Sequence, residues 1–156
     1  MPEIERKFLV DAPPPLDDGA WTARRLEQGY LAVTDAVEVR VRRADGADAR
    51  LTVKSAPGLT RVEEELALDG DAFERLWPLT EGRRVVKTRH TRRSDDDGLL
   101  FELDVYEGSL RGLTVLEVEF ASEHAAASWT PPPWIAREVT GEKAYANQSL
   151  ALYGAP

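Results

Sequence analysis

The chain has 156 residues, with 20 Lys and Arg against 28 Asp and Glu, which gives a formal charge of −8 at pH 7. This balance disfavours broad electrostatic binding to nucleic acid or to anionic membranes, so a polyanion would have to bind in a local pocket. The chain has no cysteine, which excludes disulfides, thiolate catalysis and zinc–sulfur sites. No apolar run approaches the roughly 18 residues of a membrane span. We expect a single cytoplasmic domain over residues 1–156, either monomeric or homodimeric, with neither nucleic acid nor membrane as a partner.

Alternation of apolar and polar residues predicts eight β-strands. They are expected at residues 3–9, 27–33, 37–43, 49–55, 61–68, 84–90, 99–106 and 114–121. Turn signals such as Asp45-Gly46, Pro57-Gly58 and the run that ends at Gly98 separate several of them. These short connections favour antiparallel hairpins over parallel crossovers.

The expected helices are few and short. Asp71 should cap a helix that carries Phe73 and Trp77, and Ser122 should cap an alanine-rich turn that ends near Trp129. A last helix is expected from about residue 143 to residue 152. The four tryptophans are expected to pack helices and loops against the apolar face of the sheet.

Charged residues recur at every second position along these strands, so they share one face of each strand. The charged sets are Glu3/Glu5/Lys7, Glu38/Arg40/Arg42, Arg50/Lys54, Arg61/Glu63/Glu65, Lys87/Arg89, Glu102/Asp104 and Glu117/Glu119. For any single strand, an ordinary solvent-exposed face explains the pattern. The whole set is harder to explain in that way, because like charges two residues apart repel and the helices are too few to cover a large flat sheet.

Closing the strands into a barrel would bring acidic and basic strands together around a charged lumen. We therefore expect an α+β, mainly β fold, an eight-stranded antiparallel closed barrel with a few short helices packed outside. Such a lumen suits a short chain of phosphates bound with Mg²⁺ or Mn²⁺, because carboxylates bind hard cations and Arg can fork onto phosphate oxygens. The sequence has no Gly-rich phosphate loop, so side chains would have to replace a backbone cradle.

These blocks resemble the CYTH, or triphosphate tunnel metalloenzyme, superfamily. Glu3-Ile-Glu5-Arg-Lys7 is similar to the family's E-x-E-x-K signature, and the later charged blocks follow it in the family's order along essentially the whole chain. E-x-E-x-K alone is a weak signal, whereas the ordered set is specific. The resemblance implies a tunnel that hydrolyses a triphosphate with Mg²⁺ or Mn²⁺. The compact bacterial branch, which this chain is most similar to, contains inorganic triphosphatases that release pyrophosphate and phosphate.

The same resemblance assigns roles to individual residues. Glu3 and Glu117 would hold one metal ion, and Glu5 and Glu119 a second ion that activates the attacking water. Glu65 is left open as a further ligand. The residues implied to bind the phosphates are Lys7, Arg40, Arg42, Lys54, Arg61, Lys87 and Arg89.

Tyr30 and Lys87 match a tyrosine–lysine pair that would orient or deprotonate water. The alternative for Tyr30 is a packed aromatic side chain, and the sequence does not decide between the two. One block departs from the family, because Lys143-Ala144-Tyr145 stands where an arginine often precedes the tyrosine. A phosphate contact is then either lost or partly supplied by Lys143.

Other functions fit the same fold. They are hydrolysis of a nucleoside or thiamine triphosphate, cyclisation of ATP, and non-catalytic sensing of polyphosphate or nucleotide. Both pairs of glutamates are present, which argues against a sensor, because binding an anion does not by itself need so many carboxylates.

Overall fold

The computed structural model describes residues 3–56 and 61–156, and within them nine strands form one antiparallel sheet. The strand order is β5-β4-β3-β2-β6-β7-β8-β1-β9. The strands are β1 (Ile4–Leu9), β2 (Thr22–Val33), β3 (Val37–Ala44), β4 (Asp48–Ser55), β5 (Glu63–Leu68), β6 (Arg84–Arg93), β7 (Leu100–Tyr106), β8 (Thr114–Phe120) and β9 (Arg137–Glu138). Eight of them match the predicted strands, and β9 was not predicted. The predicted Pro57-Gly58 turn lies outside the described residues.

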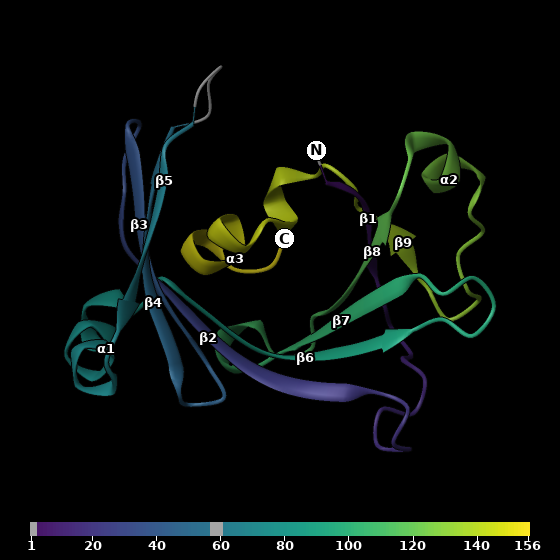
Figure 1. Cartoon of the computed structure of the whole chain (residues 1–156), viewed down its shortest axis with the longest axis horizontal. Helices are drawn as coiled ribbons and strands as arrows, with labels where there is room; N and C mark the ends of the chain where they lie inside the picture. Colours follow the sequence, from purple (N-terminus) through teal and green to yellow (C-terminus); the bar gives the residue numbers. More distant parts are fainter. Residues whose placement is uncertain (1–2, 57–60) are drawn as a thin grey trace.

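The sheet curls into an open trough (Figure 1). Strands β2, β6 and β7 form its floor, β3 to β5 form one wall, and β1 and β8 form the other. The predicted closed eight-stranded barrel is therefore wrong, because in the described part of the chain β5 pairs only with β4. The edge of β1 that does not pair with β8 pairs with β9, through Phe8 with Glu138 and Leu9 with Arg137.

The helices are short, as predicted. They are α1 (Gly70–Leu76), α2 (Glu123–Ser128) and α3 (Asn147–Tyr153), with single 3-10 turns η1 (Trp77–Thr80), η2 (Gly108–Leu110) and η3 (Lys143–Tyr145). Ser122 caps α2 as predicted, with its Oγ accepting a hydrogen bond from the Ala125 amide at 3.0 Å. The cap of α1 is Asp69 and not Asp71, since the Asp69 carboxylate lies 2.7 Å from the Ala72 amide nitrogen. No helix in the described ranges is long and apolar enough to cross a membrane.

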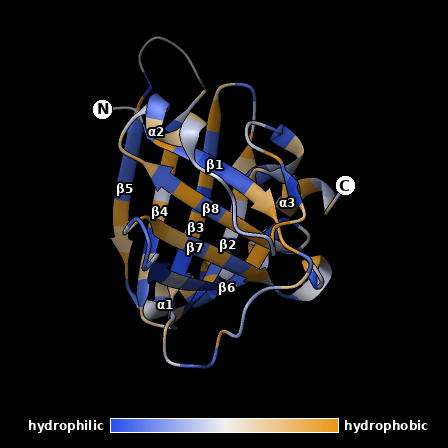
Figure 2. Ribbon diagram, turned by 90° about the vertical axis from the view of Figure 1, so that its right-hand side faces the viewer, coloured by the Kyte–Doolittle hydropathy of each residue, from blue (hydrophilic) through white to orange (hydrophobic). Residues whose placement is uncertain are grey.

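The main apolar core lies on the convex face of the sheet, opposite the charged side chains. It contains Phe8, Leu103, Leu116 and Val118, and α2 covers part of it. Figure 2 shows the underlying alternation, with hydrophilic and hydrophobic residues following one another along the strands. The predicted packing role of the tryptophans is confirmed for Trp21, Trp129 and Trp134 on this face and for Trp77, which stacks on Phe73.

The last helix lies inside the trough, which corrects the expectation that all helices pack outside (Figure 1). A second apolar cluster explains its position. Val85, Tyr106 and Val115 occupy the same face as Lys87, Asp104 and Glu117, two residues further along each strand. Leu150 and Ala151 of α3 bury this apolar end of the concave face, so the charged stripe does not run the full length of the trough.

Candidate active site

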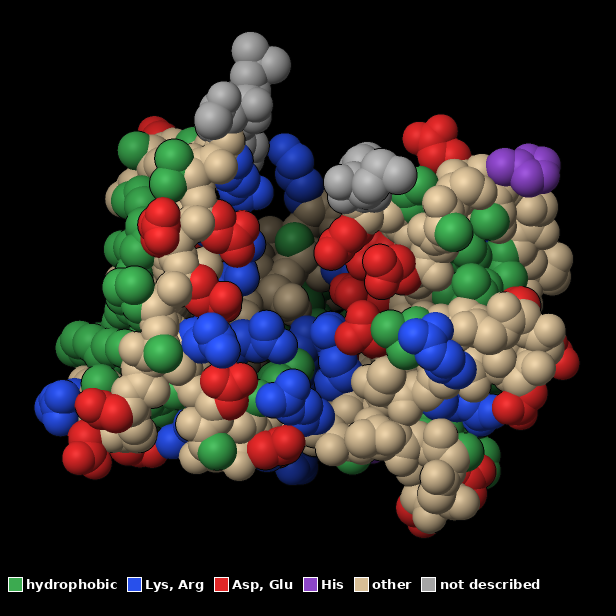
Figure 3. All heavy atoms as spheres, viewed as in Figure 1, with side chains coloured by type: hydrophobic (Ala, Val, Ile, Leu, Met, Phe, Trp, Pro, Cys, Tyr) green, Lys and Arg blue, Asp and Glu red, His purple; other side chains and the backbone are tan. Residues whose placement is uncertain are grey.

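The predicted charged side chains share the concave face of the sheet. Across the strand ladders, Glu5 lies opposite Glu119, Lys7 opposite Glu117, and Arg89 opposite Asp104. In the space-filling view, Lys and Arg surround the hollow between the two walls, and a group of Asp and Glu lies at its edge toward β1 and β8 (Figure 3). Counter-charges therefore meet in an open trough, without the closed barrel that was expected to bring them together.

Four of the predicted phosphate-binding residues line one small cavity on the floor of the trough. Arg40, Arg42, Lys87 and Arg89 surround a volume of about 140 Å³ together with Gln28, Leu26, Val85 and Asn147. None of the eight lining residues is an acid. A cavity with this lining suits anionic oxygens, because guanidinium and ammonium groups offer several donors in a confined space.

Two of these arginines keep unused hydrogen-bonding capacity. The Nε of Arg40 is buried and has no hydrogen-bond partner among the described atoms. Arg42 forms no ion pair with any acid in the part of the chain that the structure describes. Burial lowers the pKa of Arg42, and the charges of Arg89 and Arg40 lower it further. An anion bound here would supply the missing acceptors and relieve this repulsion.

Asp104 fixes the other two cations. Its side chain is 1% exposed and accepts hydrogen bonds from Lys87 Nζ at 2.7 Å and from Arg89 Nε and Nη2 at 2.8 and 2.9 Å. Burial alone would raise the pKa of Asp104, but the hydrogen bonds and charges of Arg89 and Lys87 outweigh it, and the pKa is lowered. Burial lowers the pKa of Lys87 and the nearby charge of Arg89 lowers it as well, and the charge and hydrogen bond of Asp104 only partly offset this fall. Asp104 was grouped with the charged strand faces, but its role was not predicted.

The acidic side of the trough gathers around Glu5. The pKa of Glu5 is raised by burial and then by the charges of Glu117, Glu3 and Glu102, while Lys7 opposes the rise. Glu117 lies 3.3 Å from Lys7 and 3.9 Å from Arg89. Carboxylates that raise one another's pKa are a setting that a divalent cation would stabilise.

The carboxylates fit a metal ion by their chemistry and charge. Across residues 3–56 and 61–156, however, no three His, Cys, Asp or Glu side chains lie close enough together to form a ready-made metal site. Glu3, Glu5 and Glu119 are exposed, and Glu117 is shared with two cations. Binding a metal ion here would therefore require these side chains to turn toward it and Glu117 to exchange its cationic partners.

The other predicted residues lie further from the basic cavity. Lys54 pairs with Glu63 at 3.8 Å, and Glu65 lies 3.8 Å from Arg50, both on the wall formed by β4 and β5. Arg61 precedes β5 and lines a separate hollow with Glu38, Arg83 and Gln148. Of these residues, Lys54 and Glu65 lie on the face of the sheet that carries Arg40 and Arg42.

Tyr30 is 1% exposed and belongs to the apolar cluster under α3. Its hydroxyl accepts a hydrogen bond from Gln28 Nε2 at 2.9 Å, and burial raises its pKa. This position agrees with the packed-aromatic alternative. A raised pKa also makes the phenol a weaker donor of its proton at neutral pH.

The last helix contributes polar contacts that the strand pattern does not predict. Asn147 Oδ1 accepts hydrogen bonds from the Tyr106 hydroxyl at 3.0 Å and from Lys87 Nζ at 3.4 Å. Gln148 Nε2 donates to Glu38 Oε1 at 2.7 Å. Just before this helix, Lys143 lines a cavity of about 300 Å³ with Glu5 and Lys7, which is compatible with Lys143 supplying part of the missing arginine's contact.

The fold and the site together define a class of protein: a curved antiparallel sheet whose concave face sets a basic floor against an acidic wall. The chain belongs to the family described as the CYTH domain, whose family model matches residues 1–149. It is 52% identical over 153 residues to an inorganic triphosphatase of Nitrosomonas europaea, across 97% of this chain and 98% of that protein. It is 36% identical over 152 residues to an inorganic triphosphatase of Acetivibrio thermocellus, across 95% and 92%. A crystal structure of an inorganic triphosphatase is similar over 100% of this chain and 98% of that one, with 48% identity and a TM-score of 0.86.

Proposed function

We propose that the chain hydrolyses inorganic tripolyphosphate to pyrophosphate and phosphate in the trough, with Mg²⁺ or Mn²⁺. The observation that carries this proposal is the basic cavity. There Arg42 forms no ion pair with a described acid, and Arg40, which pairs with Glu38 at 3.4 Å, keeps a buried Nε without a hydrogen-bond partner. Similarity to proteins named inorganic triphosphatase supports the same reaction. The opposite acidic wall supports hydrolysis rather than binding alone, because an anion sensor gains nothing from carboxylates beside its ligand.

In this proposal the basic residues hold the triphosphate and neutralise charge that develops on its equatorial and leaving oxygens. Arg40, Arg42, Lys87 and Arg89 contact it first, with Lys7 nearer the acidic wall and Lys54 and Arg61 further along the trough. Glu3, Glu5, Glu117 and Glu119 would hold two divalent ions, with Glu65 as a further candidate. Bound there, the ions would neutralise phosphate charge and make a coordinated water more acidic. The catalytic roles of Tyr30 and Lys87 stay predictions.

The test is a substrate panel measured by phosphate release with Mg²⁺, Mn²⁺, Ca²⁺ or excess chelator. We expect the fastest release from tripolyphosphate with Mg²⁺ or Mn²⁺, and none with chelator. ATP and thiamine triphosphate test the related hydrolases, and formation of cyclic AMP tests cyclisation. Tight binding of tripolyphosphate without turnover in any metal would contradict the enzyme and indicate a sensor.

Two substitutions test the acidic wall. Glu5→Gln and Glu119→Gln should each lower turnover by about a hundredfold or more, because each removes a carboxylate from the expected metal site. Glu64→Gln is the matched control, since Glu64 is also exposed on a strand but is one residue out of phase with Glu63 and Glu65 and so faces away from the trough. Equal activity of Glu5→Gln and Glu64→Gln would show that the metal site lies elsewhere.

A further inference from the structure

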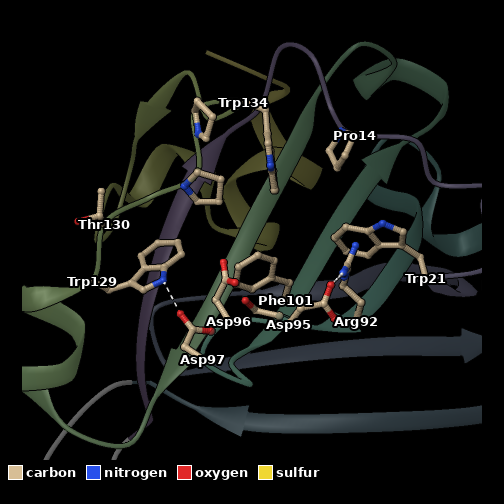
Figure 4. Close-up of a pocket in the computed structure, with 13 residues that line it drawn as sticks. Pro14, Trp21, Arg92, Asp95, Asp96, Asp97, Phe101, Trp129, Thr130 and Trp134 are labelled. Atoms are coloured by element: carbon tan, nitrogen blue, oxygen red, sulfur yellow. Dashed lines mark hydrogen bonds and ion pairs between the residues drawn. The ribbon is translucent and has the colours of Figure 1, made fainter.

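Another cavity, of about 400 Å³, lies on the convex side of the sheet, away from the trough. It is bounded by the turn between β6 and β7, by the loop that precedes β2 and by the loop that follows α2 (Figure 4). None of its lining residues is among the residues assigned to triphosphate or metal binding. The cavity is therefore a site separate from the one proposed for the substrate.

Its walls are aromatic. Trp129 and Trp134 are partly exposed and lie edge-on to the buried Phe101, with ring centroids 6.0 and 6.4 Å away. On the other side Trp21 forms part of the lining, and the guanidinium carbon of Arg92 lies 5.4 Å from its ring centroid. The faces of indole rings attract cations, and Arg92 shows that one wall of this cavity already holds a cation against an indole.

Three consecutive carboxylates lie at the edge of the cavity, from the turn between β6 and β7 (Figure 4). Asp95 pairs with Arg92 at 3.1 Å, and Asp97 accepts a hydrogen bond from Trp129 Nε1 at 3.2 Å. Asp96 forms no side-chain hydrogen bond or ion pair with a residue that the structure describes. Three acids against one guanidinium leave the cavity net negative, with one carboxylate free to meet a ligand.

We propose that this cavity binds a small organic ammonium ion, with its charged nitrogen near the Asp96 carboxylate and the tryptophan faces, and its carbon atoms against the apolar walls. The volume lies within the range of about 300 to 1,000 Å³ that is typical of small-molecule sites. An anion is disfavoured by the carboxylates. A bare metal ion is disfavoured because, among the described residues, the three carboxylates do not come together as a metal-binding group, and Asp95 and Asp97 already have partners.

The first experiment titrates the full-length protein with choline, with spermidine and with 3,3-dimethylbutan-1-ol, the neutral isostere of choline. The four indole N–H resonances, assigned with single Trp→Phe variants, report on the binding site. We expect choline or spermidine to shift the resonances of Trp129 and Trp134 and to leave that of Trp77, which stacks on Phe73 elsewhere, unchanged. The neutral isostere should bind about tenfold more weakly, because it loses the cation–π attraction.

The second experiment compares two substitutions that change the net charge equally. Asp96→Asn should weaken binding of the ammonium probe by about two- to fivefold, as expected for one partly exposed ion pair. Asp35→Asn, in the exposed turn between β2 and β3, should leave the affinity unchanged. Added salt should weaken binding to the wild type more than to Asp96→Asn. Thermal melts of both variants show whether they are folded.

Three results would overturn the proposal: no shift of any indole resonance, equal affinity for choline and its neutral isostere, or equal effects of the two aspartate substitutions. None of these measurements depends on phosphate release, so the proposal and the triphosphatase function fail or stand independently.

Discussion

Replacing Asp104 by asparagine removes the buried carboxylate that neutralises Lys87 and Arg89. Breaking one partner of a buried ion pair costs about 3–5 kcal/mol. Asparagine keeps the volume and one acceptor oxygen, and Arg89 keeps its contact with Glu102 at 2.8 Å, so we expect the lower end of that range, about 3 kcal/mol. For a chain of 156 residues this corresponds to a fall in Tm of about 6–12 °C.

The loss of stability should depend on pH. Because the folded-state pKa of Asp104 is lowered, its ionisation stabilises the fold above the ordinary Asp pKa of about 4, and this stability is lost as pH falls through the lowered value. The deficit of the variant should therefore be full at mildly acidic and neutral pH. Burial lowers the pKa of Lys87 in the folded protein below its value in the unfolded chain. Between these two pKa values the unfolded chain binds more protons than the folded protein, so stability rises with pH. Without Asp104 the pKa of Lys87 falls further, so the stability of the variant should rise more with pH than that of the wild type. The difference in stability between the two should therefore narrow as pH rises.

Urea denaturation followed by tryptophan fluorescence, at about pH 5, 7 and 9, measures these changes. Glu102→Gln is the matched control, because Glu102 also pairs with Arg89 but is 28% exposed, and its removal should cost about 1 kcal/mol or less. A loss below about 1 kcal/mol for Asp104→Asn at neutral pH would refute the role given to Asp104.

Other substitutions separate binding from stability. Arg42→Gln should raise the KM for tripolyphosphate about 10- to 100-fold, because it removes charge-assisted hydrogen bonds. The same substitution should leave the melting temperature unchanged or higher, because it relieves repulsion among the arginines. Arg111→Gln, an exposed control in the connection between β7 and β8, should leave the KM unchanged. Metal-free tripolyphosphate at about 100 times its Kd should stabilise the wild type by about 2.7 kcal/mol in urea denaturation, and this gain should be much smaller in the Arg42 variant at the same concentration. Gly29→Ala should destabilise the fold by about 1–3 kcal/mol, because the added Cβ would lie 2.5 Å from the buried Thr80 Oγ1. Gly70→Ala is the control and should not lower the melting temperature, because nothing lies within 4 Å of the added Cβ.

The spacing of charged residues along each predicted strand was enough to predict which side chains share a face. Lys87 and Arg89, Glu102 and Asp104, and Glu117 and Glu119 all lie on the concave face, as their spacing predicted. Successive side chains of any strand point to opposite faces, whatever that strand later pairs with. The antiparallel order of the strands followed from the short turns in the same local way.

In contrast, the pairing of the sheet edges and the position of α3 in the trough follow from contacts between distant segments. Closure would require β5 to meet the edge of β1, and β9 takes that edge instead. Val85, Tyr106 and Val115 interrupt the charged face, and burying them draws α3 into the trough, which places Asn147 beside Lys87, 60 residues earlier in the chain. The spacing of residues along a strand is a local property. Edge pairing and helix docking depend on competition between segments far apart in sequence, so the pattern of a single strand cannot predict them.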